Sequence, residues 1–307
     1  MIRIYDTMSH QIVDSLDLSI PSGPTESRTY GPECDYTKIP YDYTRTHMPT
    51  NRDTRPGTPS GTAEPTPPDY QLNIIGGFTD AFHFHPIIVR DSTATIYLHN
   101  NMLDYNHSYY VTIDEGVLTL PDHSFHGISK EHNWSFKTKD SVPASTDTLI
   151  VDANGQGDFN TVQGALDFIP DFSQKQTVIL IQAGDYEELV YARNKTNVKI
   201  KGAGMDRTRV HYANNEVFNP HPLTVKTNEW PGTFPSRRAA FMLDNCSDIL
   251  LEDLTIATDL HGQAEGLLLN GERIALYSVH IIGSGDALQA NGTIYMESCE
   301  LDGCLLY

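Results

Sequence analysis

Long apolar runs, positive charge and cysteine are all scarce in this 307-residue sequence. No stretch approaches the roughly 18 consecutive apolar residues that a membrane-spanning helix needs, so we expect no such helix. Lys and Arg together number 21 against 40 for Asp and Glu, which gives a formal net charge of -19. A negative field of this size repels phosphate backbones and anionic lipid head groups. We therefore expect no nucleic-acid or membrane partner.

The cysteine and histidine pattern does not predict a metal centre. The four cysteines, which show no CxxC spacing and no paired Cys/His spacing, are Cys34, Cys246, Cys299 and Cys304. Their positions alone do not assign a disulfide. His83 and His85 alternate on one face of a short run, but two histidines without a third ligand are more typical of packed or surface side chains. We expect no metal ion and no cofactor.

Eighteen prolines and 22 glycines favour strands and turns over helices. Up to residue 139, short apolar or alternating runs are separated by turn signals, which predicts an all-β module. These runs are Ile2–Tyr5, Tyr70–Ile75, Ile87–Val89, Thr95–Leu98, Tyr109–Ile113 and Trp134–Phe136. Residues 31–69 are rich in Pro and Thr and lack periodicity, which predicts a long surface loop. Residues 140–147 read as a polar linker.

The second part, residues 148–307, contains an internal repeat. One helix is expected near its start, with Thr161 as N-cap. Further on, Asn245–Leu251 aligns with Asn270–Leu276, and a shorter third copy begins at Asn291. Apolar residues follow at matching offsets in each copy, and repeats of 20 to 50 residues indicate a solenoid. Because the copies contain strand-like runs and corner Asn or Gly residues, the pattern predicts a β-solenoid with coils stacked about 4.8 Å apart.

Two polar residues leave consecutive coils at nearly the same corner of this solenoid. Gln263 follows Ile256 by seven residues, and Asp286 follows the equivalent Ile281 by five. A carboxylate beside an amide suits acyl chemistry, because the acid can move a proton while the amide N–H stabilises an oxyanion. Spacing alone does not decide this, since most exposed Asp and Gln residues are only solvated.

Five motifs in this second part, in order, are similar to those of the pectin methylesterases. The stretch Asp152–Leu166 resembles the opening coil and cap helix of that family, and Gly184–Glu188 matches its GxYxE motif. Gly262–Leu267 (GQAEGL) is similar to GQAxAL, Gly285–Leu288 (GDAL) to QDTL, and Tyr295–Gly303 to FYRDCYIEG. The resemblance implies a right-handed parallel β-helix that hydrolyses the methyl esters of homogalacturonan, yielding pectate and methanol.

The resemblance also implies roles for individual residues. The family uses one aspartate as nucleophile and a second as acid and base, with glutamine N–H groups at the oxyanion. Asp286 matches the acid/base, Gln263 the oxyanion glutamine, and Thr233 a substrate-contacting threonine. Trp230 could stack on a sugar ring in the substrate groove.

The sequence departs from the family pattern in three places. Gly285 stands where a second oxyanion glutamine is usual, and Gln289 is a candidate replacement. An apolar residue, about Leu306, falls where the nucleophilic aspartate belongs, while Asp302 aligns with a different position. The later GRxW motif lies beyond Tyr307. We therefore expect a β-helix truncated at its C-terminal end, with low or no esterase activity.

The first part, residues 1–139, is similar to the bacterial Ig-like β-sandwich modules of secreted carbohydrate enzymes. Tyr109–Ile113, Gly116–Leu118 and Trp134–Thr138 carry this likeness. It implies a role in spacing, stability or weak glycan contact. The resemblance to the pectin methylesterases implies a secreted, extracellular or periplasmic location, although the chain shows no signal peptide, and we expect a monomer. Because the protein is acidic, it should favour nearly neutral, highly methylated pectin over the polyanionic product.

Two alternatives to the esterase hypothesis remain open from the sequence. A non-catalytic glycan-binding or adhesion protein could keep both modules without turnover. A pectate lyase shares the β-helix fold, but its chemistry needs a calcium-binding acidic cluster and a base. We find no such cluster in the sequence around Gln263 and Asp286.

Overall fold

The computed structural model describes residues 1–24, 70–78, 81–119, 125–132, 134–219 and 237–304. Its contacts divide the chain into two compact units, with the main boundary between Ala144 and Ser145. Among the described residues, those within 1–23, 70–74 and 82–144 belong to the N-terminal unit, and residue 24 with those within 75–81 and 145–304 belong to the C-terminal unit. Within the described ranges, no helix is long and apolar enough to cross a membrane.

The N-terminal unit is built on an antiparallel sheet of four strands, ordered β2-β1-β7-β8. These strands are β1 (Ile2–Asp6), β2 (Ile12–Leu16), β7 (Ser108–Ile113) and β8 (Ser135–Lys137), and a 3-10 turn covers Lys130–His132. Two short antiparallel pairs complete it: β3 (Leu72–Asn73) with β4 (Phe82–His83), and β5 (Ile87–Arg90) with β6 (Thr93–Ile96). An all-β unit is therefore present, and its assignment to the Ig-like class stays a prediction.

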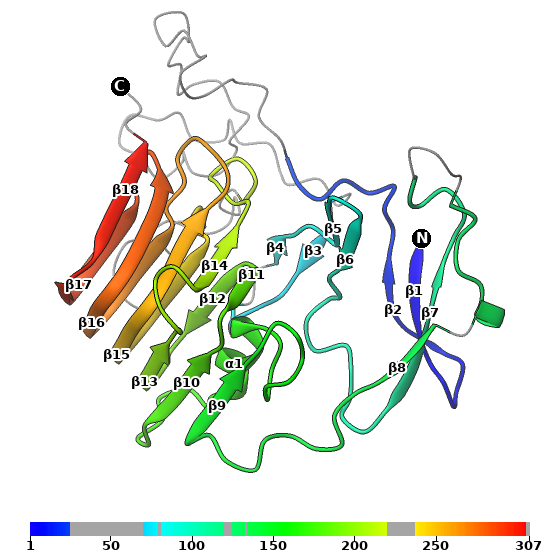
Figure 1. The fold of residues 1–307 in the computed structure, drawn as a ribbon, viewed down its shortest axis with the longest axis horizontal. Coiled ribbons are helices and arrows are strands. Elements are labelled where there is room, and N and C mark those ends of the chain that lie inside the picture. Colours follow the sequence, from blue (N-terminus) through cyan, green and yellow to red (C-terminus); the bar gives the residue numbers. More distant parts are fainter. Residues whose placement is uncertain (25–69, 79–80, 120–124, 133, 220–236, 305–307) are drawn as a thin grey trace, which may run out of the picture. The chain divides into compact units, whose positions relative to one another are not determined.

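The C-terminal unit is a parallel β-helix of stacked strands (Figure 1), and the strand registers place them in three columns. Its short strands are β9 (Thr148–Val151), β10 (Thr177–Ile181), β11 (Gly184–Glu187), β12 (Val190–Arg193), β13 (Thr196–Lys201), β14 (Thr208–Tyr212) and β18 (Glu300–Cys304). Its long strands, which bend around corners, are β15 (Phe241–Thr258), β16 (Leu267–Ser284) and β17 (Leu288–Glu297). The predicted all-β fold with a parallel β-helix is confirmed.

Stacked equivalents explain the repeat seen in the sequence. Ile249 pairs with Ile274, and that residue with Ile294, so identical apolar side chains form a ladder inside the helix. The corner alignment needs one correction, because Asn270 stacks on Asp244 rather than on Asn245. Asn245 takes a left-handed φ of 52° and occupies a register shift at that corner. The Asn270 side-chain amide donates to Asp244 Oδ1 at 2.7 Å, which links the two coils.

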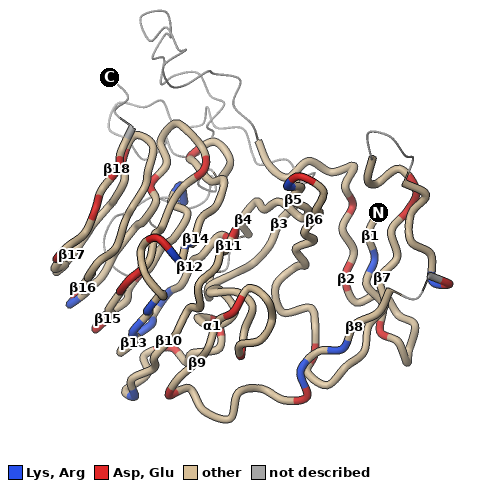
Figure 2. Tube along the Cα trace, in the orientation of Figure 1, with Lys and Arg blue, Asp and Glu red and all other residues tan. Residues whose placement is uncertain are grey.

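Charged residues line the outside of the same stack. Lys199 and Lys201 on β13 lie beside Glu252 on β15, at N–O distances of 2.7 Å and 3.2 Å. Lys201 also contacts Asp253 at 2.7 Å. Acidic and basic positions therefore face each other across neighbouring coils (Figure 2). These pairs are partly exposed, so each contributes little to stability.

The segment between β3 and β4 packs against the β-helix. Residues 75–81 belong to the C-terminal unit. The Phe78 ring lies 5.9 Å from the Tyr191 ring, and the Arg193 guanidinium lies 4.2 Å from the Phe78 centroid. A Cβ on Gly76 would overlap the Tyr191 carbonyl, so only glycine permits this close approach. No periodic pattern in the sequence predicts that this segment packs on Tyr191 and Arg193.

Helix α1 (Val162–Phe168) closes the first coil as predicted. Thr161 is its N-cap and accepts a hydrogen bond from the Gly164 N–H at 3.1 Å. The Glu188 carboxylate adds a second cap, accepting from the backbone N–H groups of Val162 and Gln163 at 2.7 Å and 2.9 Å. Glu188 is buried, and this burial raises its pKa to about 7 despite those two hydrogen bonds.

The raised pKa of Glu188 predicts how stability depends on pH. Because the folded-state pKa exceeds the usual 4.5, the folded state holds a proton that the unfolded chain releases. Stability is therefore fully present below about pH 4.5 and declines as pH rises to about 7. Urea unfolding of a Glu188→Gln variant should show a weaker loss between pH 5 and 8 than the wild type shows. An identical pH slope in both proteins would refute this assignment.

Candidate active site at a corner of the β-helix

The two residues singled out by the sequence lie in neighbouring loops at one corner of the β-helix. Gln263 lies between β15 and β16, and Asp286 lies between β16 and β17. Ala264 and Ser284 exchange two backbone hydrogen bonds of 2.9 Å and 2.7 Å, which tie the two loops together. Ser284 also forms a bridge with Asp286. The loops are thus held by backbone contacts rather than by side-chain packing alone.

Arg238 connects the two side chains. Its Nη1 lies 3.4 Å from Gln263 Oε1, and its Nη2 lies 3.8 Å from Asp286 Oδ2. A guanidinium can only donate, so the amide oxygen of Gln263 must face it. The amide nitrogen then points the other way, toward Gly285, where an added Cβ would lie 3.6 Å from Nε2. Gln263 therefore directs its N–H donors toward Gly285, the residue that precedes Asp286.

A buried ion pair holds Arg238 in place. Arg238 Nε lies 2.5 Å from Glu265 Oε1, and the Glu265 side chain is fully buried. Within the described residues, Glu265 Oε2 has no hydrogen-bond partner. The motifs of the sequence did not predict this pair, although a signal was present. Glu265 interrupts the apolar end of the GQAEGL motif, and a charge at such a position needs a partner.

Burial and neighbouring charges set the protonation of this corner. Burial raises the pKa of Glu265 to about 7, against the opposing charge of Arg238 and with a further contribution from Asp286. Burial lowers the pKa of Arg238, but the carboxylates of Glu265, Glu216 and Asp286 more than offset this and raise it. The Asp286 side chain is 58% exposed. It is thus the carboxylate of this network that solvent reaches.

The remaining predicted site residues are placed only in part. Gln289 lies on β17, stacked on Leu268 and half-buried, and its role as a replacement oxyanion donor stays a prediction. Thr233, Trp230 and Leu306 lie outside the described residues. Asp302 lies on β18, where its carboxylate is 2.8 Å from His280 Nε2. Within the described ranges, Asp286 is therefore the one exposed carboxylate paired with Arg238.

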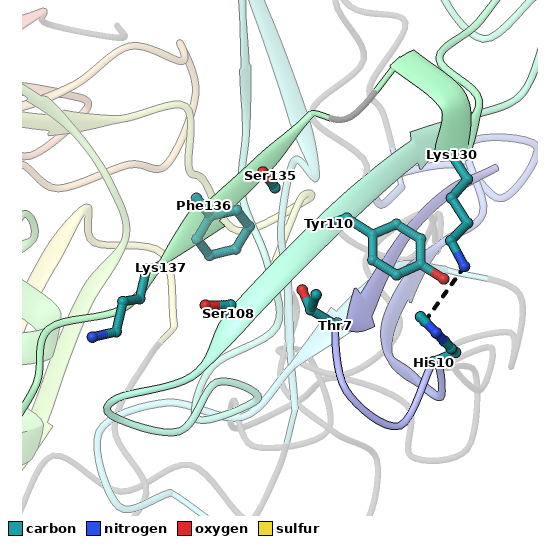
Figure 3. Close-up of a pocket in the computed structure, with 8 residues that line it drawn as sticks. All are labelled: Thr7, His10, Ser108, Tyr110, Lys130, Ser135, Phe136 and Lys137. Atoms are coloured by element: carbon teal, nitrogen blue, oxygen red, sulfur yellow. Dashed lines mark hydrogen bonds between the residues drawn. The ribbon is translucent and has the colours of Figure 1, made fainter.

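The N-terminal unit has a pocket of its own. The cavity has a volume of about 510 Å³, and eight residues line it (Figure 3). Lys130 Nζ lies 3.5 Å from His10 Nδ1 and 5.3 Å from the centroid of the Tyr110 ring. The Tyr110 ring also stacks on Tyr5 at 4.8 Å. Aromatic faces beside amino groups are compatible with glycan contact, but none of the eight lining residues is a carboxylate that could act in catalysis.

A parallel β-helix with a carboxylate and an oriented amide at one corner has the elements of an ester hydrolase. Comparison with known proteins agrees: the family model described as Pectinesterase matches residues 148–307. The chain belongs to the pectinesterase family, whose members are carboxylic ester hydrolases.

Individual relatives cover only part of this chain. It is 28% identical over 172 residues to probable pectinesterase 8 of Arabidopsis thaliana, covering 54% of this chain and 42% of that protein. It is 30% identical to putative pectinesterase 14 of the same plant, covering 60% and 53%. A solved carrot pectin methylesterase is similar at 22% identity with a TM-score of 0.41, covering 52% and 47%. The chain thus spans about half the length of these relatives.

Proposed function

We propose that this corner hydrolyses the methyl esters of homogalacturonan, releasing methanol and leaving pectate. Family membership supports the class of substrate, and the arrangement of Gln263, Arg238 and Asp286 carries the chemistry. Arg238 fixes the amide of Gln263 so that its N–H groups face the same space as the exposed carboxylate of Asp286. The proposal extends to a secreted location and to action on pectin outside the cell.

Each side chain has a defined task in the proposed reaction. The Gln263 N–H groups donate to the negative oxygen that forms when the ester carbonyl becomes tetrahedral. With water as the attacking group, the Asp286 carboxylate takes a proton from the water as its oxygen bonds to the carbonyl carbon, and protonated Asp286 then gives that proton to the methanol oxygen as the ester C–O bond breaks. The attacking carboxylate of the family mechanism is not among the described residues. We therefore propose that this chain turns over slowly.

Loss of the oriented amide should lower activity strongly. Replacing Gln263 with alanine removes one oxyanion donor, which typically costs about 10²–10³-fold in kcat. Methanol release from highly methylated pectin measures this, with Gln289→Ala as the matched variant. A comparable loss in Gln289→Ala would identify Gln289 as the second donor. Unchanged kcat in Gln263→Ala would contradict the proposed oxyanion site.

The non-catalytic alternative predicts a different result in the same assay. Gln263 and Asp286 could hold a sugar chain through hydrogen bonds without breaking the ester. A folded chain that binds methylated pectin and releases no methanol above the buffer rate would favour that function. The alternative is kept because no attacking carboxylate lies among the described residues of this corner.

A further inference from the structure

A second polar cluster lies on the outer face of the β-helix, at the ends of β11, β14 and β15. The ligand atoms of Glu187, His211 and Asp259 all lie within 4.8 Å of one another. Glu187 and His211 are cross-strand neighbours, as are Asp185 and Arg209 two positions earlier on the same strands. We call Asp185, Glu187, His211 and Asp259 the His211 cluster. None of its members belongs to the Arg238 network.

The buried imidazole of His211 shows why this cluster differs from a group of surface acids. The side chain is only 4% exposed, and its Nδ1 lies 2.5 Å from Asp259 Oδ2. Because a carboxylate only accepts, Nδ1 carries the hydrogen, and Nε2 of the neutral ring then presents a lone pair. Nε2 faces Asp185 Oδ1 at 3.1 Å, yet it has no hydrogen-bond partner in the described part of the chain. In the neutral form of the ring, a cation bound between Nε2 and Asp185 would satisfy both groups.

The neighbouring groups assign the roles within the cluster. Arg209 Nη2 donates to Asp259 Oδ1 at 2.9 Å, so both oxygens of Asp259 already have partners. A carboxylate that orients a histidine through Nδ1 while Nε2 binds a metal is a recurrent arrangement in metal sites. With a neutral imidazole, the three carboxylates and Arg209 leave a net charge of -2, which a divalent ion neutralises.

We propose that the His211 cluster binds a divalent transition-metal ion such as Zn²⁺. His211 Nε2 and the Asp185 carboxylate, whose nearest atoms lie 3.1 Å apart, are the ligands, Glu187 lies in the same cluster, and Asp259 orients the ring. Imidazole nitrogen favours zinc-class ions over Ca²⁺ or Mg²⁺, which prefer oxygen. Because the Asp185 side chain is 66% exposed, an ion can reach it from solvent. Because the ligands come from two stacked strands and the orienting group follows a third, the ion would link successive coils.

Zinc binding to the full chain tests this proposal directly. After treatment with a chelator, calorimetric titration with Zn²⁺ should show one site per chain with micromolar or tighter affinity. Saturating zinc should raise the thermal midpoint by about 5 °C, because a ligand of the folded state stabilises it. Ca²⁺ or Mg²⁺ at the same concentration should leave the midpoint unchanged.

Three variants distinguish zinc bound at the His211 cluster from zinc bound elsewhere on the chain. Asp185→Asn changes an exposed side chain and should weaken zinc binding at least tenfold, and His211→Asn should abolish it. His280→Asn is the matched control, because His280 also pairs with a carboxylate on the same column of strands. Absence of zinc binding would show that a proton, and not a metal, sits between His211 and Asp185. Equal binding by all variants would place the zinc elsewhere and overturn the proposal.

Discussion

Replacing Arg238 with alanine is expected to destabilise the β-helix by about 3–5 kcal/mol at pH 8, because the buried Glu265 carboxylate loses its counter-charge. Glu265 is fully buried and its pKa is already raised to about 7 with Arg238 present. Without Arg238 that pKa rises further, so the group is neutral in the variant at pH 5. The destabilisation should therefore be smaller at pH 5 than at pH 8. Urea unfolding at both pH values measures the difference.

A double variant provides the control for this effect. Arg238→Met combined with Glu265→Met removes both charges and keeps similar side-chain volumes, and such replacements are often neutral or stabilising. We expect the double variant to be more stable than Arg238→Ala at pH 8. A loss under about 1 kcal/mol in Arg238→Ala, or one equal at both pH values, would show that the pair contributes little.

Replacing Gly271 with alanine is expected to disrupt the stacking of β15 on β16. An added Cβ would lie 2.0 Å from the Cys246 carbonyl oxygen of the coil below, and backbone atoms there cannot move without breaking the ladder. Overpacking of a rigid interior typically costs about 1–3 kcal/mol, and a clash with backbone should lie at or above that range. Unfolding midpoints of the purified variants measure this effect.

The neighbouring residue supplies a matched control for the glycine. Glu272→Ala changes an exposed side chain one position further along β16, so it should alter stability by no more than about 0.5 kcal/mol. Gly292 repeats the geometry on the next coil, since its Cβ would overlap the Gly271 carbonyl oxygen at 1.7 Å. A Gly271→Ala variant as stable as Glu272→Ala would mean that the coils can separate locally at little cost.

Periodic features of the sequence predicted the fold well. The apolar ladder from Ile249 to Ile274 and the N-cap at Thr161 follow from local rules, because burial and capping depend on nearby residues. The corner at Asn245 was placed one residue off, because a left-handed residue there changes the register without changing the spacing of apolar side chains. Such bulges leave little trace in a periodic pattern.

The candidate site was predicted only in part, for a related reason. Equivalent positions on adjacent coils brought Gln263 and Asp286 together, and spacing was enough to see this. Arg238 and Glu265 contribute through burial and charge, which depend on what lies above and below them. The same holds for His211, whose partner Asp259 lies 48 residues away along the chain. Contacts between coils that join positions not equivalent in the repeat are invisible to a search for local motifs.

In the proposed function, ester hydrolysis at this corner depends on the Asp286 carboxylate, and methanol release is the most direct test of that dependence. The wild-type chain, Asp286→Asn and Asp302→Asn should be compared on highly methylated pectin at equal concentrations of folded protein. Asp302 is a suitable control because its side chain is 69% exposed and lies on the neighbouring coil. We expect slow release that persists in Asp302→Asn and falls to the buffer rate in Asp286→Asn. Release that is unchanged in Asp286→Asn would show that Asp286 has no part in the reaction.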